Sequence, residues 1–189
     1  MAWQRLSDDE KNDLLQVIGD DTLPGLFDSE YGIAQHTPYH FYEDCSLIVW
    51  ENLKIAPPFT FDYLRSGQYI VYLDGSAEPF EKLNSLGCLN LTSETVVDYL
   101  EFFCHYVNQR PQNILLLRNP DTMPFQDTVF IDFHFDKNNY TEKDIKVARN
   151  ADDSGYIITA PYVFAGKIDR GIATISDSGA VHIERESPR

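Results

Sequence analysis

The segment that most constrains the fold is residues 93–107, where polar side chains recur along one narrow stripe. At about 100° per residue, the polar positions cover roughly 80° of a helix, and most of the remaining circumference is apolar. Thr92, just before this segment, is a suitable N-cap. The pattern predicts a helix over about 93–107 that is largely buried, pressed on a sheet. The polar positions are Glu94, Asp98, Glu101, His105 and Asn108.

A second helix is expected near the N-terminus. Ser7 and Glu10 have the spacing of a capping box, in which each side chain bonds the backbone N–H of the other residue. Apolar residues follow at helical spacing, and Gly19 suits a helix end. The sequence therefore predicts an N-terminal helix over about 8–18.

Short apolar runs bounded by turn residues predict the strands. The first two are residues 45–50 and 69–73, and residues 114–117 form a continuous apolar run that is typical of a central strand. Residues 128–136 alternate between apolar and polar side chains, as a strand with one solvated face does. By contrast, residues 20–44 are interrupted by glycine and proline and are expected to be irregular.

From Lys146 onward, three or four strands are expected. Turn-forming residues separate them at 152–155, 165–166 and 177–179. Together these elements predict an α+β fold: a mostly antiparallel sheet with a C-terminal β-meander, packed against the two helices. A length of 189 residues fits a single compact domain, residues 1–189.

The chain is strongly acidic, with a formal net charge of -15 and a pI near 4.5. Residues 1–101 hold 18 acidic and 5 basic residues, whereas residues 102–189 hold 12 and 10. This charge repels nucleic acids and anionic membranes, so neither is expected as a direct partner. A protein partner with a basic surface is favoured instead.

Cysteine usage and hydropathy bear on the location. The three cysteines are odd in number and form no CxxC motif, which fits a reducing compartment. No apolar signal segment begins the chain, and no uncharged apolar run approaches the roughly 18 residues of a membrane span. We therefore expect a cytoplasmic protein.

Candidate partner-binding residues lie in and around the segment 20–44, where acids alternate with aromatic rings. Acids steer a basic partner over long range, and rings can anchor it at short range. The prediction is that this segment forms part of an interface. The candidate contacts are Asp20, Asp21, Tyr39, Phe41, Glu43 and Asp44.

Three polar residues of the 128–136 strand are a further candidate site. Asp132, His134 and Asp136 occupy positions i, i+2 and i+4, so their side chains point to one face of a strand. They could hold a divalent metal, or a carboxylate could orient His134 as a base. A solvated strand face produces the same pattern.

Metal ligands and cysteine nucleophiles are otherwise weakly indicated. His36, His40 and Cys45 are zinc-ligand types, but Pro38 interrupts any helix that would place the histidines on one face. Cys104 and His105 are adjacent on the expected helix, so they point about 100° apart and cannot pair. Cys104 falls on the apolar side and is expected in the core.

No sequence motif indicates a reaction. GxGxxG, GxxxxGK(S/T), GxSxG and HExxH are all absent. The function favoured is therefore a non-enzymatic acidic binding or regulatory protein that engages a protein partner, as an inhibitor or antitoxin does, without a cofactor. The alternative is a small-molecule-binding protein or enzyme with an aromatic-lined pocket under a curved sheet, since 13% of the residues are aromatic.

Overall fold

The computed structural model of the chain describes residues 3–18, 30–54, 56, 58–108, 114–118, 145–164 and 167–186. The chain divides into two compact units. Unit 1 comprises Met1–Asp74 and Glu78–Asn90, and unit 2 comprises Gly75–Ala77 and Leu91–Arg189. A division of this kind does not test whether residues 1–189 form a single domain, which stays a prediction.

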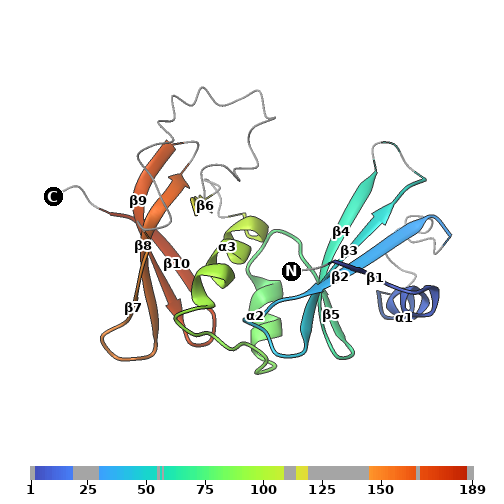
Figure 1. The fold of residues 1–189 in the computed structure, drawn as a ribbon, viewed down its shortest axis with the longest axis horizontal. Coiled ribbons are helices and arrows are strands. Elements are labelled where there is room, and N and C mark those ends of the chain that lie inside the picture. Colours follow the sequence, from blue (N-terminus) through green and yellow to red (C-terminus); the bar gives the residue numbers. More distant parts are fainter. Residues whose placement is uncertain are drawn as a thin grey trace. The chain divides into compact units, whose positions relative to one another are not determined.

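Unit 1 is built on a five-stranded antiparallel sheet whose strands follow one another in chain order (Figure 1). Helix α1 lies between the first two strands in sequence, and α2 follows the last. The elements are β1 (Gln4–Arg5), α1 (Asp8–Ile18), β2 (Gly32–Pro38), β3 (Cys45–Asn52), β4 (Phe59–Ser66), β5 (Tyr69–Tyr72) and α2 (Glu78–Asn84).

Helix α1 covers one face of this sheet. The register places Ala34, Trp50 and Phe61 opposite one another on β2, β3 and β4, so their side chains share a face. Trp50 is fully buried and belongs to the same apolar cluster as Leu14 of α1. The packing of the apolar side of α1 against these side chains stabilises the helix on the sheet.

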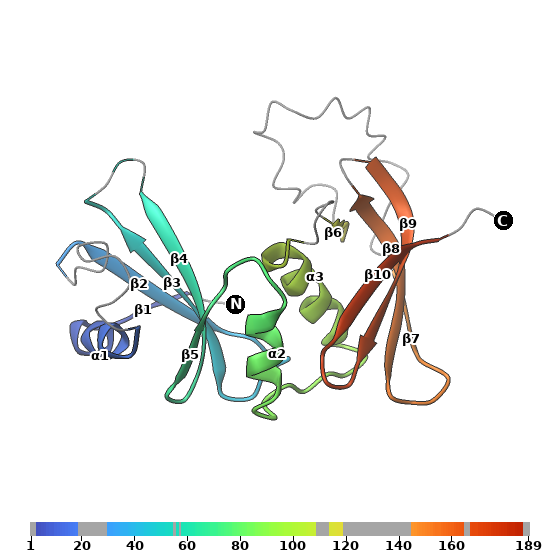
Figure 2. The ribbon, with the colours of Figure 1, turned by 180° about the vertical axis from the view of Figure 1, so that it is seen from behind.

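Helix α2 packs against β4 and β5 on the other face of the sheet, as Figure 2 shows from behind. Leu47 and Leu64 point to this face, lie opposite each other and are buried. Phe80 and Leu83 of α2 are buried as well. The sheet of unit 1 is therefore a middle layer between two helices.

The expectation that residues 20–44 are irregular is wrong for β2. A Cβ atom on Gly32 would lie 2.1 Å from Cζ2 of Trp50, so this glycine is needed for close packing within a strand. Strand β4 and helix α2 were not foreseen from the sequence. Gly67, with φ 57°, makes the tight turn between β4 and β5.

Unit 2 contains a second antiparallel sheet, with the order β10-β9-β8-β6 and with β7 also paired to β8. The long strand β8 pairs with β7 through residues 156–159 and with β6 through residues 162–164. Strands β7 to β10 follow one another as the predicted C-terminal meander, which is confirmed. The elements are α3 (Val96–Tyr106), β6 (Ile114–Leu116), β7 (Lys146–Arg149), β8 (Gly155–Phe164), β9 (Lys167–Ser176) and β10 (Val181–Arg185).

Helix α3 is the largely buried helix that the sequence predicts. Leu100, Phe103 and Cys104 are buried, whereas Glu101 and His105 on the polar stripe are exposed. The predicted polar stripe is thus the solvent side of the helix. The full set of buried α3 side chains is Val96, Tyr99, Leu100, Phe102, Phe103 and Cys104.

The predicted capping is confirmed for α1, whereas α3 begins at Val96 with Thr95 as its N-cap, so the expectation that Thr92 caps this helix is wrong. The Ser7 backbone N–H donates to Glu10 Oε2 at 2.8 Å, and the Glu10 N–H donates to Ser7 Oγ at 3.4 Å, which is a capping box. Thr92 Oγ1 accepts the backbone N–H groups of Glu94 and Thr95, each at 3.2 Å, in the turn that leads into α3.

The α+β class with antiparallel sheets is therefore confirmed. Strand β10 ends the strand order of its sheet, with His182 and Glu184 exposed and Ile183 buried. The predicted strand over 128–136 lies outside the described residues. Within the described part of the chain, no helix has both the length and the apolar character that crossing a membrane requires.

A candidate protein-binding surface

Two segments of unit 1 that are far apart in sequence lie side by side in the structure. The Glu43 N–H donates to the Cys88 carbonyl at 2.7 Å, and the Asn90 N–H donates to the Phe41 carbonyl at 2.9 Å. Between these bonds, Tyr42 and Leu89 form an antiparallel bridge. Residues 39–44 and 84–90, together called the paired-loop surface, are thus held by backbone bonds.

Aromatic side chains anchor this surface from inside. The ring of Phe41 is fully buried, and the half-buried ring of Tyr39 stacks on it with centroids 4.9 Å apart. The Tyr42 hydroxyl donates to Asn84 Oδ1 at 2.8 Å, which ties the two segments together a second time. The burial of Phe41 means that its ring does not reach the surface, so it serves the predicted interface only by supporting Tyr39.

The two acids of the paired-loop surface point outward. Glu43 and Asp44 are exposed, and the two segments contain no lysine or arginine. Glu43 Oε1 accepts a long hydrogen bond of 3.4 Å from Asn90 Nδ2. As far as the structure describes the chain, neither carboxylate forms an ion pair. Asp44 has φ 54°, a left-handed conformation that aspartate tolerates better than most residues, and β3 begins immediately after it.

Unit 1 also exposes large apolar side chains. Leu86, within the paired-loop surface, is 50% exposed. Each of the other large hydrophobic side chains that the described residues expose also belongs to unit 1. Large exposed apolar groups are typical of interaction surfaces when they gather in one region. These other side chains are Trp3, Val17, Tyr31, Leu53, Phe59 and Tyr72.

The remaining predicted site residues are distributed as follows. Asp20 and Asp21 lie outside the described residues, and so do Asp132, His134 and Asp136. Tyr39, Glu43 and Asp44 are brought together with residues 84–90. Sequence reasoning missed that second segment because no local pattern connects it to the first.

Two of the cysteines, Cys88 and Cys104, have a raised pKa. Burial, assisted by the neighbouring thiol of Cys45, raises the pKa of Cys88 to about 12. Burial also raises the pKa of Cys104 to about 12, while His105 beside it is exposed. Since the thiolate is the reactive form, neither Cys88 nor Cys104 suits nucleophilic catalysis near neutral pH.

The zinc-type residues of this region are not assembled. His36 lies opposite Ile48 in the register and shares its face of the sheet, whereas Cys45 points to the other face. Throughout the residues that the structure describes, no three histidine, cysteine, aspartate or glutamate side chains are grouped so that they could hold a metal ion.

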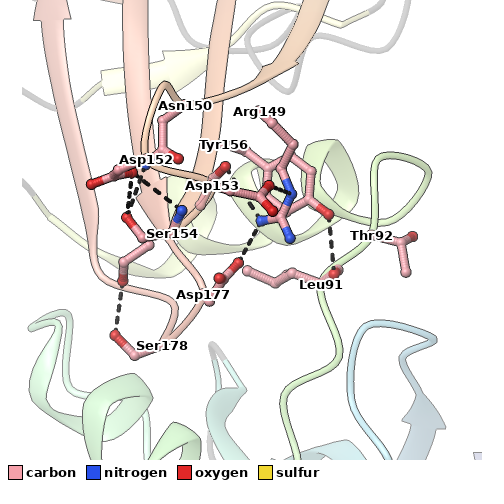
Figure 3. A network of polar contacts seen from close by, with 12 residues as sticks. Leu91, Thr92, Arg149, Asn150, Asp152, Asp153, Ser154, Tyr156, Asp177 and Ser178 are labelled. Carbon is pink, nitrogen blue, oxygen red and sulfur yellow. Dashed lines mark hydrogen bonds and ion pairs between the residues drawn. The ribbon is translucent and has the colours of Figure 1, made fainter.

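Unit 2 presents a polar network at the tips of two hairpins (Figure 3). Arg149 Nη1 lies 2.7 Å from Asp177 Oδ1, and Arg149 Nε lies 3.1 Å from Asp153 Oδ1. Its guanidinium also lies over the Tyr156 ring, 4.4 Å from the centroid. Two acids of these tips, Asp153 and Asp177, are therefore paired with an arginine, whereas Asp152 accepts hydrogen bonds from Ser154.

Comparison with known proteins does not assign a function. No protein-family model, curated protein or solved structure matches the chain.

Proposed function

We propose that this protein is a non-enzymatic acidic binding protein, which engages the basic surface of a partner protein through unit 1 and regulates that partner as an inhibitor does. The observation that carries the proposal is the paired-loop surface, where Glu43 and Asp44 are exposed beside Leu86 on a backbone fixed by hydrogen bonds. A basic protein can satisfy both carboxylates while Leu86 and Tyr39 provide apolar contact.

The order of this surface supports the proposal. A loop that is disordered before binding must be ordered at the moment of association, which costs free energy. Residues 39–44 are already fixed by the bridge to Leu89 and by the Tyr42–Asn84 bond. The acids are thus presented to a partner at little entropic cost.

Charge supports the choice of partner. Unit 1 holds 15 acidic and 5 basic residues, so its field attracts cations over long range and repels nucleic acids and anionic membranes. The three cysteines are all free, which fits a reducing compartment such as the cytoplasm. Asp20 and Asp21 are among the acidic residues counted in unit 1.

Capture by matched variants tests the proposal. Wild-type protein, the double variant Glu43→Gln/Asp44→Asn and the control Asp8→Asn/Asp9→Asn are immobilised and exposed to lysate of the source organism. The control removes the same charge from α1, on the other side of the sheet. We expect a basic protein to be retained by the wild type and the control and lost from the Glu43/Asp44 variant.

Association and dissociation rates measured with the captured protein then distinguish long-range electrostatic attraction from short-range contact. Neutralising Glu43 and Asp44 should lower the association rate, whereas Tyr39→Ala should raise the dissociation rate. Raising the salt from about 0.01 M to about 1 M, which shortens the Debye length from about 30 Å to about 3 Å, should slow association. The proposed surface would be refuted if the partner protein were retained equally at low and high salt, and equally by the wild type and the Glu43/Asp44 variant.

A further inference from the structure

A cavity of about 250 Å³ opens between α1 and the β4–β5 hairpin of unit 1. Asp13 and Gln16 of α1 line one side, Arg65 and Gln68 of the hairpin line the other, and Leu14 and Ile70 supply apolar surface. At about 30 Å³ per molecule of liquid water, the cavity has room for about eight waters, so it suits a ligand of amino-acid size. Among the described residues, no aromatic ring lines it.

The guanidinium of Arg65 is held in place but not neutralised. Its Nε donates to the Gly67 carbonyl at 3.0 Å, which fixes the side chain against the turn. Glu10, the acid whose charge acts on it, already accepts two bonds from Ser7, at 2.8 Å and 2.7 Å. Within the described part of the chain Arg65 forms no ion pair, so its terminal N–H groups are available for bidentate contact with a carboxylate.

Asp13 brings the opposite charge to the α1 side of the cavity. It too forms no ion pair among the described residues. Lys11, the nearest lysine in the sequence, pairs with Asp8 at 2.7 Å instead. The cavity therefore places one unpaired anion on the helix and one unpaired cation on the hairpin, and these two groups do not pair with each other.

We infer that this cavity binds a free α-amino acid with an uncharged side chain. The ligand carboxylate contacts Arg65, its ammonium group contacts Asp13, and its side chain lies on Leu14 and Ile70, with the amides of Gln16 and Gln68 available for hydrogen bonds. A simple anion would leave Asp13 facing like charge, and a simple cation would do the same for Arg65. A zwitterion satisfies both, and this inference does not rest on the proposed function.

Calorimetric titration of the full chain tests the inference. The probes are the standard L-amino acids with uncharged side chains, each supplied at about 10 mM, which detects a Kd of about 1 mM. For leucine, 4-methylpentanoic acid lacks the amine and 3-methylbutylamine lacks the carboxylate. We expect at least one amino acid to bind, and its analogues lacking either charged group to bind about tenfold more weakly or worse.

Variants locate the binding. Arg65→Met and Asp13→Asn should each weaken it about tenfold or more, whereas the controls Arg170→Met and Asp9→Asn should leave it unchanged. Circular dichroism verifies that each variant is folded, and Asp13 is an exposed helix residue whose substitution by asparagine keeps its shape. Absence of binding by every probe, binding indifferent to both cavity variants, or equal binding of either analogue overturns the inference.

Discussion

Unit 1 and unit 2 each contain a five-stranded antiparallel sheet, yet they differ in their exposed apolar side chains and in their ion pairs. Over the described residues, exposed large hydrophobic side chains occur only in unit 1. The ion pairs described in unit 1, Lys11–Asp8 and Lys82–Glu78, lie within single helices. In unit 2, arginines join different elements: Arg118 pairs with Asp98, Arg149 with Asp177, and Arg170 with Glu186.

The balance of charge follows the same division. Unit 1 has 15 acidic residues against 5 basic ones, whereas unit 2 has 15 against 10. Unit 2 thus has more basic residues with which its acids can pair, while Glu43, Asp44 and Asp13 in unit 1 form no ion pair among the residues that the structure describes. Among the described residues, the charges of unit 2 therefore join separate elements of its structure, which the ion pairs of unit 1 do not do.

If the units differ at the surface and not in their cores, truncating one core ring in each should have similar effects. Trp50 in unit 1 is fully buried, and Phe103 in unit 2 is 4% exposed. Trp50→Ala and Phe103→Ala should each lower the free energy of unfolding by about 3–5 kcal/mol, because each leaves a cavity. Urea unfolding measures this. A loss below about 1 kcal/mol for either variant would show that its unit lacks a closed core.

Alkaline pH should destabilise both units. Burial raises the pKa of Tyr63 in unit 1 to about 12 from its usual 10.0, and that of Cys104 in unit 2 to about 12 from its usual 9.0. Each group loses its proton more readily when unfolded, so its stabilisation is complete below the unfolded pKa and is lost as pH rises through the folded one.

The measurement is urea unfolding at several pH values between neutral and strongly alkaline. The free energy of unfolding should be level up to the usual cysteine pKa of 9.0 and fall above it. In Cys104→Ala the fall should be shallower at its onset, and in Tyr63→Phe shallower above the usual tyrosine pKa of 10.0. Curves parallel to wild type in both variants would contradict the assignment.

Buried tyrosine hydroxyls sharpen the comparison of the cores. In unit 2, the Tyr99 hydroxyl donates to the buried Gly179 carbonyl at 2.7 Å, so Tyr99→Phe should cost about 1–3 kcal/mol. Within the described part of the chain, the buried Tyr162 hydroxyl has no hydrogen-bond partner, so Tyr162→Phe should leave stability unchanged or raise it. In unit 1, Tyr42→Phe breaks a partly buried bond and should cost about 0.5–1.5 kcal/mol.

Thermal and urea unfolding of the three variants give the ranking. If Tyr162→Phe lowered the free energy of unfolding as much as Tyr99→Phe does, the Tyr162 hydroxyl would have a hydrogen-bond partner in solution. The side-chain packing around β8 would then differ from that described above.

The sequence predicted those parts of the fold whose signals are local. The capping box of Ser7 and Glu10 fixes the start of α1, and the polar stripe of α3 identifies its solvent side. Turn residues at 152–155 and 177–179 separate the strands of the meander. Strand β2 was missed because its decisive feature, the approach of Trp50 to Gly32, joins residues that are distant in the chain.

The candidate site was predictable only in part, for the same reason. The acids Glu43 and Asp44 were evident from composition. The pairing of residues 41–43 with 88–90 depends on tertiary structure, and no periodicity in residues 39–44 shows that Phe41 points inward while Asp44 points outward. The placement of Asp13 and Arg65 around one cavity likewise arises only when α1 packs beside the β4–β5 hairpin.

The smallest effect is expected at the hairpin tips of unit 2, where Arg149 is paired to Asp177 and Asp153 at the surface. Exposed ion pairs gain little, because water and salt screen them and both side chains lose freedom. Arg149→Met should therefore lower the free energy of unfolding by less than Tyr99→Phe does, and the loss should shrink at high salt.

A double-mutant cycle with Asp177→Asn isolates this pair from the contact of Arg149 with the Tyr156 ring. The coupling between Arg149 and Asp177 should be favourable at low salt and close to zero at about 1 M, where the Debye length is about 3 Å. The same cycle for Lys82 and Glu78 in unit 1 should give a weaker coupling, because that pair lies within one helix and ties no separate elements together. Equal couplings in the two units would remove the distinction between ion pairs that join separate elements in unit 2 and ion pairs within single helices in unit 1.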